Sequence, residues 1–263
     1  MRDILADIVA KKREIVEKGK RQISLATLKD ELQPASFAVS RKFRRESWSL
    51  IAECKLQSPA KGRLTEGYTV DQLAKIYAAN GASALSIHTD PHFLGKNEDL
   101  QRVRKLVDIP LLRKDFIIDP YQIYEARYLG ADAVLLIARI LSKEQLKEFV
   151  FCAWELGMDT LVEVHDEADM EAALYTPAEL IGINNRNLKT FTTSIEQTLS
   201  LLSIADKERF LISESGIFSA KDARALYDAG CDGILVGEGL VRAEDVGEMT
   251  RALKGMAESR ASA

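Results

Sequence analysis

The sequence has few cysteines and no long apolar run, and both shortages exclude classes of protein. Its three cysteines, Cys54, Cys152 and Cys231, lie far apart and form no Cys-x-x-Cys pair. They therefore indicate neither a disulfide framework nor a zinc site, and reduced thiols in the cytoplasm are expected. The longest apolar runs, such as residues 133–138, fall far short of the roughly 18 residues that a membrane span needs. No membrane partner is expected.

The sequence also lacks an excess of positive charge, a linker and a signal peptide. Its 36 Lys and Arg oppose 40 Asp and Glu, and a net charge of −4 argues against general nucleic-acid binding. Asp3 and Asp7 interrupt the first apolar stretch, where a signal peptide would be continuous. No Pro-, Gly- or Ser-rich tract divides the chain. We therefore expect one folded unit with no nucleic-acid partner.

What the sequence does contain is a repeated pattern of helix, glycine and strand. Gly81, Gly130, Gly157 and Gly230 each close a helical pattern and precede a short apolar run. Glycine after a helix takes the left-handed conformation at low cost, and the chain then enters the next strand. Eight strand-like runs are centred near residues 51, 85, 111, 134, 161, 181, 211 and 234. Their mean spacing of about 26 residues suits one βα unit each.

These eight units predict an α/β protein, a single (β/α)8 TIM barrel with an N-terminal helical extension. The length alone left two architectures open, either two ordinary domains or one barrel of about 250 residues. The unbroken repeat favours the barrel. Residues 1–47 are expected to form the extension and to pack on the barrel, and residues 48–263 are expected to form the catalytic barrel.

Polar residues gather at the predicted carboxyl ends of the strands, where a TIM barrel carries its chemistry. The period of two places Glu53 and Lys55 on one face of the first strand and Glu163 on the equivalent face of the fifth. If these faces line the lumen, two carboxylates and an ammonium converge, and Lys114 enters from the third strand. A salt-bridge network that only closes the barrel top would leave the same pattern. The opposite rim is far poorer in polar residues, which favours an enzyme.

Glycine-containing turns follow the seventh and eighth predicted strands, at residues 215–216 and 237–239. Backbone N–H groups at these turns form the usual phosphate site of such barrels. The signal is weak by itself, because glycine also serves turn geometry. Glu238 would have to turn its carboxylate away and offer only its amide, while Lys55 and Ser58 are candidates to supplement the site.

Five motifs occur together along the chain. Residues 51–62, IAECKLQSPAKG, resemble the E-x-K-x-x-S-P-x-K-G signature of the indole-3-glycerol-phosphate synthase family. Four further motifs match in the family's order: LRKDFI at 112–117, LVEVH at 161–165, GINNRNL at 182–188 and SESGI at 213–217. A single motif would be modest evidence for the family, but five in register are specific.

The resemblance implies a (β/α)8 barrel that needs neither a metal nor an organic cofactor. It also implies a carboxy-lyase of tryptophan biosynthesis, which converts 1-(2-carboxyphenylamino)-1-deoxyribulose 5-phosphate into indole-3-glycerol phosphate, CO2 and water. The expected partner is therefore a small phosphorylated anthranilate-sugar. Because the barrel and its extension use the whole chain, we expect a monofunctional, cytoplasmic protein, most simply a monomer.

The resemblance also implies catalytic roles by motif position. Lys114 resembles the general acid of ring closure, and Glu163 resembles the carboxylate that stabilises the cation or accepts a proton. Lys55 would hold the substrate carboxylate and is a second candidate acid, for dehydration; the division of labour between the two lysines stays open. Glu53 would orient either lysine. These roles require burial to bring a lysine pKa down towards the working pH.

The remaining implied contacts are with the substrate. Asn184 and Arg186 would orient its hydroxyls or its carboxylate. Its phosphate site would be lined by Ser58, Ser215, Gly216, Gly237 and Glu238, with Glu214 beside them. Its anthranilate ring would lie against Phe93, Phe116, Leu135 and Leu188, although apolar rim residues are as often plain core.

The chain departs from the family pattern in one loop and at one strand end. Leu56 and Gln57 stand where a basic residue and alanine are usual, and Ala60 replaces a common serine, so the loop's grip on the substrate could differ. His88 stands where Leu or Val is usual. We interpret it as a hydrogen-bonded rim residue rather than a catalytic or substrate-contacting one, with the hypothesis that it tunes the pKa of a nearby lysine. His92 and His165 are interpreted as structural or solvent-facing.

Two alternatives are considered. A phosphoribosylanthranilate isomerase type of barrel would need a Cys and Asp acid–base pair, which has no evident counterpart here. A catalytically idle scaffold barrel would gain nothing from a converged, charged rim. Formation of indole fluorescence from the carboxyphenylamino-deoxyribulose phosphate would separate the synthase from both.

Overall fold

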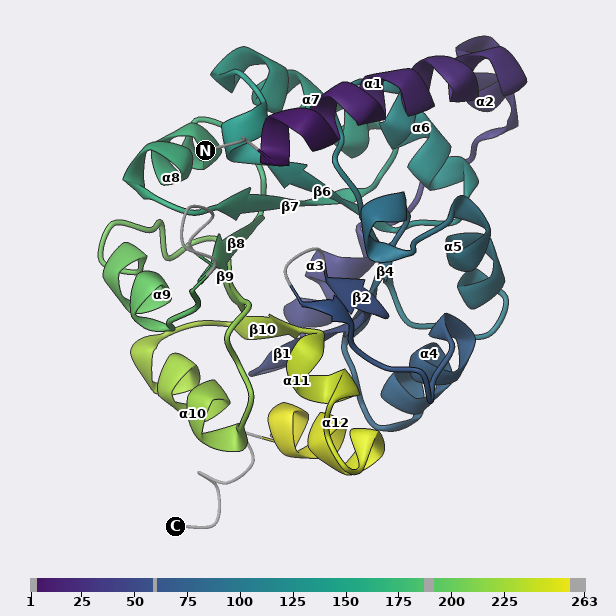
Figure 1. The fold of residues 1–263 in the computed structure, drawn as a ribbon. Coiled ribbons are helices and arrows are strands. Elements are labelled where there is room, and N and C mark those ends of the chain that lie inside the picture. The colour runs from purple at the N-terminus through teal and green to yellow at the C-terminus, as the bar shows by residue number, and fades with distance from the viewer. Residues whose placement is uncertain (1–3, 59–60, 187–191, 256–263) are drawn as a thin grey trace.

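The computed structural model describes residues 4–58, 61–186 and 192–255, which contain a closed barrel of eight parallel strands (Figure 1). The first strand pairs with both the second and the last strand of the barrel, and this double pairing closes the sheet. The predicted TIM barrel is confirmed. In chain order the strands are β1 (Ser49–Cys54), β4 (Ala84–His88), β5 (Leu111–Lys114), β6 (Ala133–Ile137), β7 (Asp159–Val164), β8 (Leu180–Asn184), β9 (Phe210–Glu214) and β10 (Gly233–Val236).

Helices follow the strands and cover the outside of the barrel (Figure 1). Gly81, Gly130, Gly157 and Gly230 take positive φ angles of 90°, 95°, 66° and 101° at the ends of four of them. The left-handed helix ends predicted from the sequence are therefore present. The helices after β1 are α4 (Val70–Ala79), α5 (Asn97–Arg104), α6 (Tyr121–Tyr128), α7 (Lys143–Glu155), α8 (Glu167–Leu174), α9 (Glu196–Leu201), α10 (Ala220–Ala229) and α12 (Val246–Lys254).

Short elements follow several strands and so lie on the carboxyl side of the barrel. A small hairpin comes after β1, 3-10 helices come after β4 and β6, and a single helical turn comes after β10. Within the described ranges, no helix combines the length and the apolar character needed to cross a membrane. The short elements are β2 (Gln57–Ser58), β3 (Gly62–Arg63), η1 (Pro91–Phe93), η2 (Ala138–Ile140) and α11 (Glu238–Val241).

The core has two layers, and strand alternation decides which layer each residue enters. On β1, Ala52 and Cys54 pack in the layer between strands and helices, whereas Ile51 packs in the barrel lumen. On β7, Val162 belongs to the outer layer and Leu161 to the lumen. The lumen is therefore apolar below the carboxyl ends, and the predicted faces of β1 and β7 are confirmed.

The N-terminal segment reaches both ends of the barrel. It contains α1 (Ile4–Gln22), α2 (Leu25–Glu31) and α3 (Ala38–Phe43). The last of these closes the amino end, where the Phe43 ring meets Phe210 edge-on with centroids 5.9 Å apart. The Asp159 carboxylate, at the start of β7, accepts the Val39 and Ser40 amides at 2.9 and 3.2 Å. At the other end, α1 lies near α6 on the carboxyl side (Figure 1).

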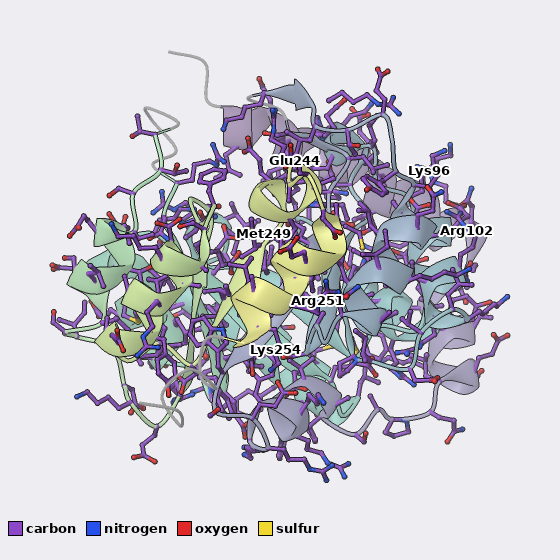
Figure 2. The ribbon with its side chains drawn as sticks, turned by 90° about the horizontal axis from the view of Figure 1, so that it is seen from below. Lys96, Arg102, Glu244, Met249, Arg251 and Lys254 are labelled. Atoms are coloured by element: carbon purple, nitrogen blue, oxygen red, sulfur yellow. The ribbon has the colours of Figure 1, made fainter. Side chains whose placement is uncertain are left out.

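The last helix, α12, fastens the segment that leads into β1. Trp48 Nε1 donates a hydrogen bond to the Leu253 carbonyl oxygen at 2.8 Å. Lys254, at the end of α12 (Figure 2), donates to the Glu46 carboxylate at 2.7 Å and also to the Trp48 carbonyl. The two ends of the barrel sequence are thereby held together.

Candidate active site

A cavity of about 610 Å³ opens at the carboxyl ends of the strands. Every residue predicted for the site lines it, except Leu188, which lies outside the described residues. Side chains from all eight strand ends converge here, as barrel geometry requires. The predicted residues that line the cavity are Glu53, Lys55, Ser58, Phe93, Lys114, Phe116, Leu135, Glu163, Asn184, Arg186, Glu214, Ser215, Gly216, Gly237 and Glu238.

Lys114 ends β5 and lies between the carboxylates of Glu163 on β7 and Glu214 on β9. Its Nζ is 2.5 Å from Glu214 Oε2 and 3.4 Å from Glu163 Oε2. Burial disfavours the ammonium, but the negative charges of these two groups and of Glu53 outweigh burial and raise the pKa of Lys114 above its ordinary value. The expectation that burial would bring a lysine pKa down is wrong at Lys114, because the carboxylates converge on its ammonium group.

The two carboxylates beside Lys114 differ in their proton affinity. Burial, together with the charge of Glu163, raises the pKa of Glu214 to about 7, although Lys114 opposes the change. Burial would also raise the pKa of Glu163, but Lys114, His165 and a hydrogen bond from Asn184 outweigh burial and lower this pKa. The cluster therefore holds one ionised carboxylate and one that can carry a proton near neutral pH.

Glu53 occupies the neighbouring part of the lumen. Its Oε2 is 3.4 Å from Lys55 Nζ, and its Oε1 is 2.9 Å from His88 Nε2. Burial would raise the pKa of Glu53, but the positive charges of Lys55 and Lys114 and the hydrogen bond from His88 hold it well below its usual range. Burial lowers the pKa of His88, so the neutral ring donates its Nε2 hydrogen to Glu53. His88 is thus a buried, hydrogen-bonded rim residue.

An apolar wall faces these charges. The Phe93 ring stacks on His88, with centroids 4.3 Å apart, and lies 6.3 Å from the Phe116 ring. Lys55 Nζ lies 5.3 Å from the Phe93 centroid, within the range of a cation–π contact. Leu135 comes from the lumen side of β6. Flat apolar groups and ammonium groups therefore border the same space.

The turns after β9 and β10 form another side of the cavity. Ser215 and Gly216 both take left-handed φ angles, 68° and 74°. Asn185 holds this turn by donating to the Ser215 carbonyl at 3.0 Å. The carboxylate of Glu238 is bound by Lys61 at 2.8 Å and by Arg242 at 3.2 Å. These two cations offset its negative charge at this side of the cavity.

The sequence analysis missed several cavity residues. Leu5 and Ile8, from α1, line the cavity although the extension carried no predicted site residue. His165 also lines it, and its side chain is only 5% exposed, so of its two interpretations, structural or solvent-facing, the solvent-facing one is wrong. A signal for His165 existed in the sequence. It follows Leu161 and Glu163 at the same period of two, which puts all three on one face.

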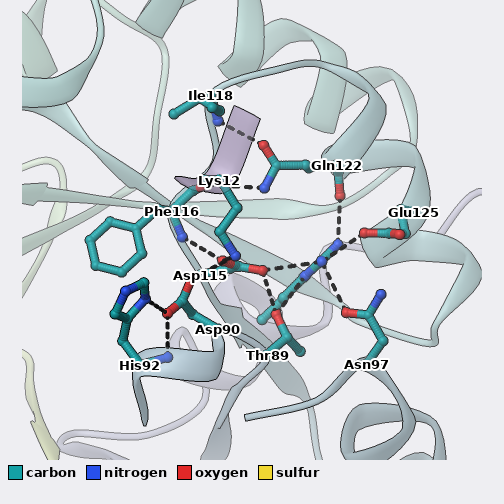
Figure 3. A network of polar contacts seen from close by, with 11 residues as sticks. Lys12, Thr89, Asp90, His92, Asn97, Asp115, Phe116, Ile118, Gln122 and Glu125 are labelled. Atoms are coloured by element: carbon teal, nitrogen blue, oxygen red, sulfur yellow. Dashed lines mark hydrogen bonds and ion pairs between the residues drawn. The ribbon is translucent and has the colours of Figure 1, made fainter. Parts of the chain in front are cut away.

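A buried ion network explains how α1 reaches the cavity (Figure 3). Lys12 Nζ lies 2.7 Å from Asp90 Oδ2 and 2.6 Å from Asp115 Oδ1, and all three side chains are almost fully buried. Asp90 and Asp115 follow the ends of β4 and β5, so Lys12 fixes α1 to the rim. Ile8 and Leu5 lie about one and two helical turns before Lys12, which brings them over the cavity.

A cavity at the carboxyl ends of eight parallel strands, lined by paired ammonium and carboxylate groups, defines a TIM-barrel enzyme. The family model for indole-3-glycerol phosphate synthase matches residues 5–253. The chain belongs to this family, as its motifs predicted. A relative named indole-3-glycerol phosphate synthase, from Polynucleobacter asymbioticus, is 45% identical over 259 residues and the match covers 94% of this chain and 97% of the relative. A relative of the same name, from Alkaliphilus metalliredigens, is 43% identical over 257 residues, and this match covers 95% of this chain and 98% of the relative.

Solved structures of more distant barrels share the fold. The 3-hexulose-6-phosphate synthase from Salmonella typhimurium has a TM-score of 0.66 at 14% identity, covering 80% of this chain and 99% of its own. The phosphoribosylanthranilate isomerase from Thermotoga maritima has a TM-score of 0.57 at 15% identity, covering 80% and 98%. At such identities the likeness concerns the fold alone, so the isomerase alternative gains no support from it.

Proposed function

We propose that the protein closes the indole ring of indole-3-glycerol phosphate, with loss of CO2 and water, from 1-(2-carboxyphenylamino)-1-deoxyribulose 5-phosphate. The observation that carries this proposal is Lys114 Nζ, held 2.5 Å from Glu214 and 3.4 Å from Glu163 in a cavity with one apolar wall. Family membership supports the same reaction.

Lys114 is the proposed acid of ring closure. An aromatic carbon attacks a ketone poorly unless the developing alkoxide is protonated or stabilised. The raised pKa keeps Lys114 charged until the ketone oxygen gains negative charge in the transition state. Attack leaves positive charge on the ring and its nitrogen, and the ionised Glu163 lies on the same side of the cavity to stabilise that charge.

Lys55 is the proposed partner of the substrate carboxylate and an acid for the loss of water, with Glu53 orienting it at 3.4 Å. The carboxylate leaves as neutral CO2, so each turnover takes up one proton overall. Two protons enter, at the ketone oxygen and at the departing hydroxyl, and one leaves the carbon of the new ring that lies between the nitrogen and the carbon that loses its hydroxyl. Glu163 is the proposed acceptor of the proton that leaves.

The rest of the cavity suits the two ends of the substrate. Phe93, Phe116 and Leu135 form a wall of the size and polarity of an anthranilate ring, with Leu188 as a further predicted contact. Asn184 and Arg186 would meet its hydroxyls or carboxylate. The proposed phosphate site is lined by Ser58, Ser215, Gly216, Gly237 and the backbone amide of Glu238.

The test is to add the substrate and follow indole fluorescence. Lys114→Met and Glu163→Gln are expected to lower kcat by at least about 10²-fold, because each removes a charge that acts on the reacting atoms. Circular dichroism should show folded barrels. Lys143→Met is the matched control, since Lys143 pairs with Glu171 on the exposed face of α7 and α8. A folded parent protein without activity, or full activity in Lys114→Met, would refute the proposal.

We also propose that one chain suffices and that it acts in the cytoplasm. The described cavity residues already supply two lysines, the carboxylates, the apolar wall and the turns. Sedimentation equilibrium at assay concentrations should give the mass of one chain, and an active dimer with an inactive monomer would contradict this.

A further inference from the structure

His165 is a buried residue that the proposed roles leave unused. It follows the last residue of β7, and both of its ring nitrogens are buried without a hydrogen-bond partner among the described residues. Buried polar atoms are normally paired, since leaving them unpaired costs free energy. An imidazole kept in this state at the edge of the cavity calls for an explanation.

The ring lies between two carboxylates. Its Nε2 is 3.4 Å from Glu163 Oε1, and its Nδ1 is 3.6 Å from Asp169 Oδ2. Neither contact has the geometry of a hydrogen bond, but catalytic contacts are often long or poorly aligned before the substrate binds. Because neither nitrogen makes a hydrogen bond, nothing in the described surroundings fixes one tautomer.

The backbone around His165 is nevertheless held firmly. Its amide donates to Asp169 Oδ2 at 2.9 Å, and its carbonyl accepts from the Gln197 side chain at 2.9 Å. The ring is therefore placed by its backbone and by packing, while its two nitrogens stay available for proton exchange.

The groups beyond the ring lead towards solvent. Asp169 lies in the first turn of α8 and is bound by Arg139 Nη2 at 2.6 Å, and Arg139 also binds Asp166 at 2.9 Å. Side-chain exposure is 7% at Glu163, 5% at His165 and 9% at Asp169, and then 57% at Asp166. Two further polar groups face this series of side chains, Lys114 and Asn184, and both contact Glu163.

We infer that His165 is a positioning residue that relays protons between Glu163 and the solvent beyond Asp169. This inference rests on the proposed function, in which each turnover takes up one proton while the substrate covers Lys114 and Glu163. Nδ1 takes a solvent proton by way of the Asp169 carboxylate, the Nε2 proton passes to Glu163 Oε1, and Glu163 returns it to Lys114, while the charge of Asp169 stabilises the transient imidazolium. The proton that Glu163 later takes from the substrate carbon leaves by the reverse path, and Lys55 regains its proton from solvent, so one proton is taken up overall.

The kinetic test uses His165→Gln and His165→Ala. In His165→Gln we expect kcat to fall about 10²-fold with KM within about twofold, since the ring relays protons and does not bind substrate. The decline of kcat with rising pH should steepen, and the solvent deuterium isotope effect on kcat should grow. Added imidazole should restore part of kcat in His165→Ala. His92→Gln is the matched control, because His92 lies outside the cavity lining.

A second measurement needs no substrate. The ring ¹⁵N signals of His165 should move in Glu163→Gln and stay in place in Glu171→Gln, whose carboxylate is exposed on α8. A kcat in His165→Gln within about twofold of the parent would overturn the relay. A loss of kcat with unchanged pH profile and isotope effect, and without imidazole rescue, would also overturn it. An inactive parent would instead refute the proposed function, and the NMR response would still decide whether His165 and Glu163 are coupled.

Discussion

At the scale of single residues, the central carboxylates have room because two strand ends carry no side chain. A Cβ at Gly182, on β8, would collide with Glu214 Oε1. A Cβ at Gly237, after β10, would collide with Glu53 Oε2. Both glycines therefore leave room for a carboxylate. A side chain at Gly182 would displace Glu214 from Lys114, and a side chain at Gly237 would displace Glu53 from Lys55.

Gly182→Ala tests this role. The added methyl should push Glu214 away from Lys114, lowering kcat by about 10-fold or more and costing about 1–3 kcal/mol of stability. Activity and thermal unfolding measured on the same sample check both effects. Gly255→Ala is the control, since a Cβ there meets no atom within 4 Å. Unchanged kcat in Gly182→Ala would show that the position of Glu214 does not matter.

At the scale of elements, the strands and helices were predictable because their signals are local. The glycines that end four helices take the conformation that their sequence position indicated. The third predicted strand run, centred near residue 111, is the apolar stretch of residues 109–112, but β5 begins only at Leu111. Pro110 explains the difference, since it has no N–H for the ladder, although its carbonyl still accepts from Leu85 at 2.9 Å.

The sequence predicted that the N-terminal extension packs on the barrel, but not that Lys12 anchors α1 to the rim, and Lys12→Met tests what this contact contributes. The change leaves Asp90 and Asp115 buried without their shared cation, which should cost about 3–5 kcal/mol of stability. KM should rise, because Leu5 and Ile8 would lose their anchor. Denaturant unfolding and steady-state kinetics measure the two effects.

Lys11→Met is a matched control for this prediction. Lys11 is the neighbouring residue on α1, but its side chain is 60% exposed and pairs only with Glu14. Its loss should change stability by at most about 0.5 kcal/mol. Equal effects of the two substitutions would rule out a special role for the buried network.

At the scale of the whole molecule, the carboxylate cluster links the site to global stability. Glu214 has a folded-state pKa of about 7, above the ordinary value of 4.5. Between these two values the folded protein binds more protons than the unfolded chain, so this group makes stability fall as pH rises from 4.5 to 7.

Glu214→Gln should remove that loss. Relative to the parent, the variant should become more stable as pH rises from about 5 to 7.5, by an amount on the order of 1 kcal/mol or more. Unfolding free energies measured across this pH range give the difference directly. Parallel curves for the two proteins would mean that Glu214 does not titrate in this window. Activity should fall, because Lys114 loses its nearest carboxylate.

The sequence by itself determined the barrel, the polar rim, the lumen faces of β1 and β7 and the family, because each rests on periodicity or on residues close together in the chain. Only the tertiary structure decided how the rim residues pair. Lys114 and Glu214 are 100 residues apart and meet at 2.5 Å only because the barrel closes. That meeting reverses the expected direction of the Lys114 pKa. The burial of His165 and the approach of α1 likewise depend on packing between segments that are far apart in the chain. A local sequence pattern does not indicate which distant segments will meet.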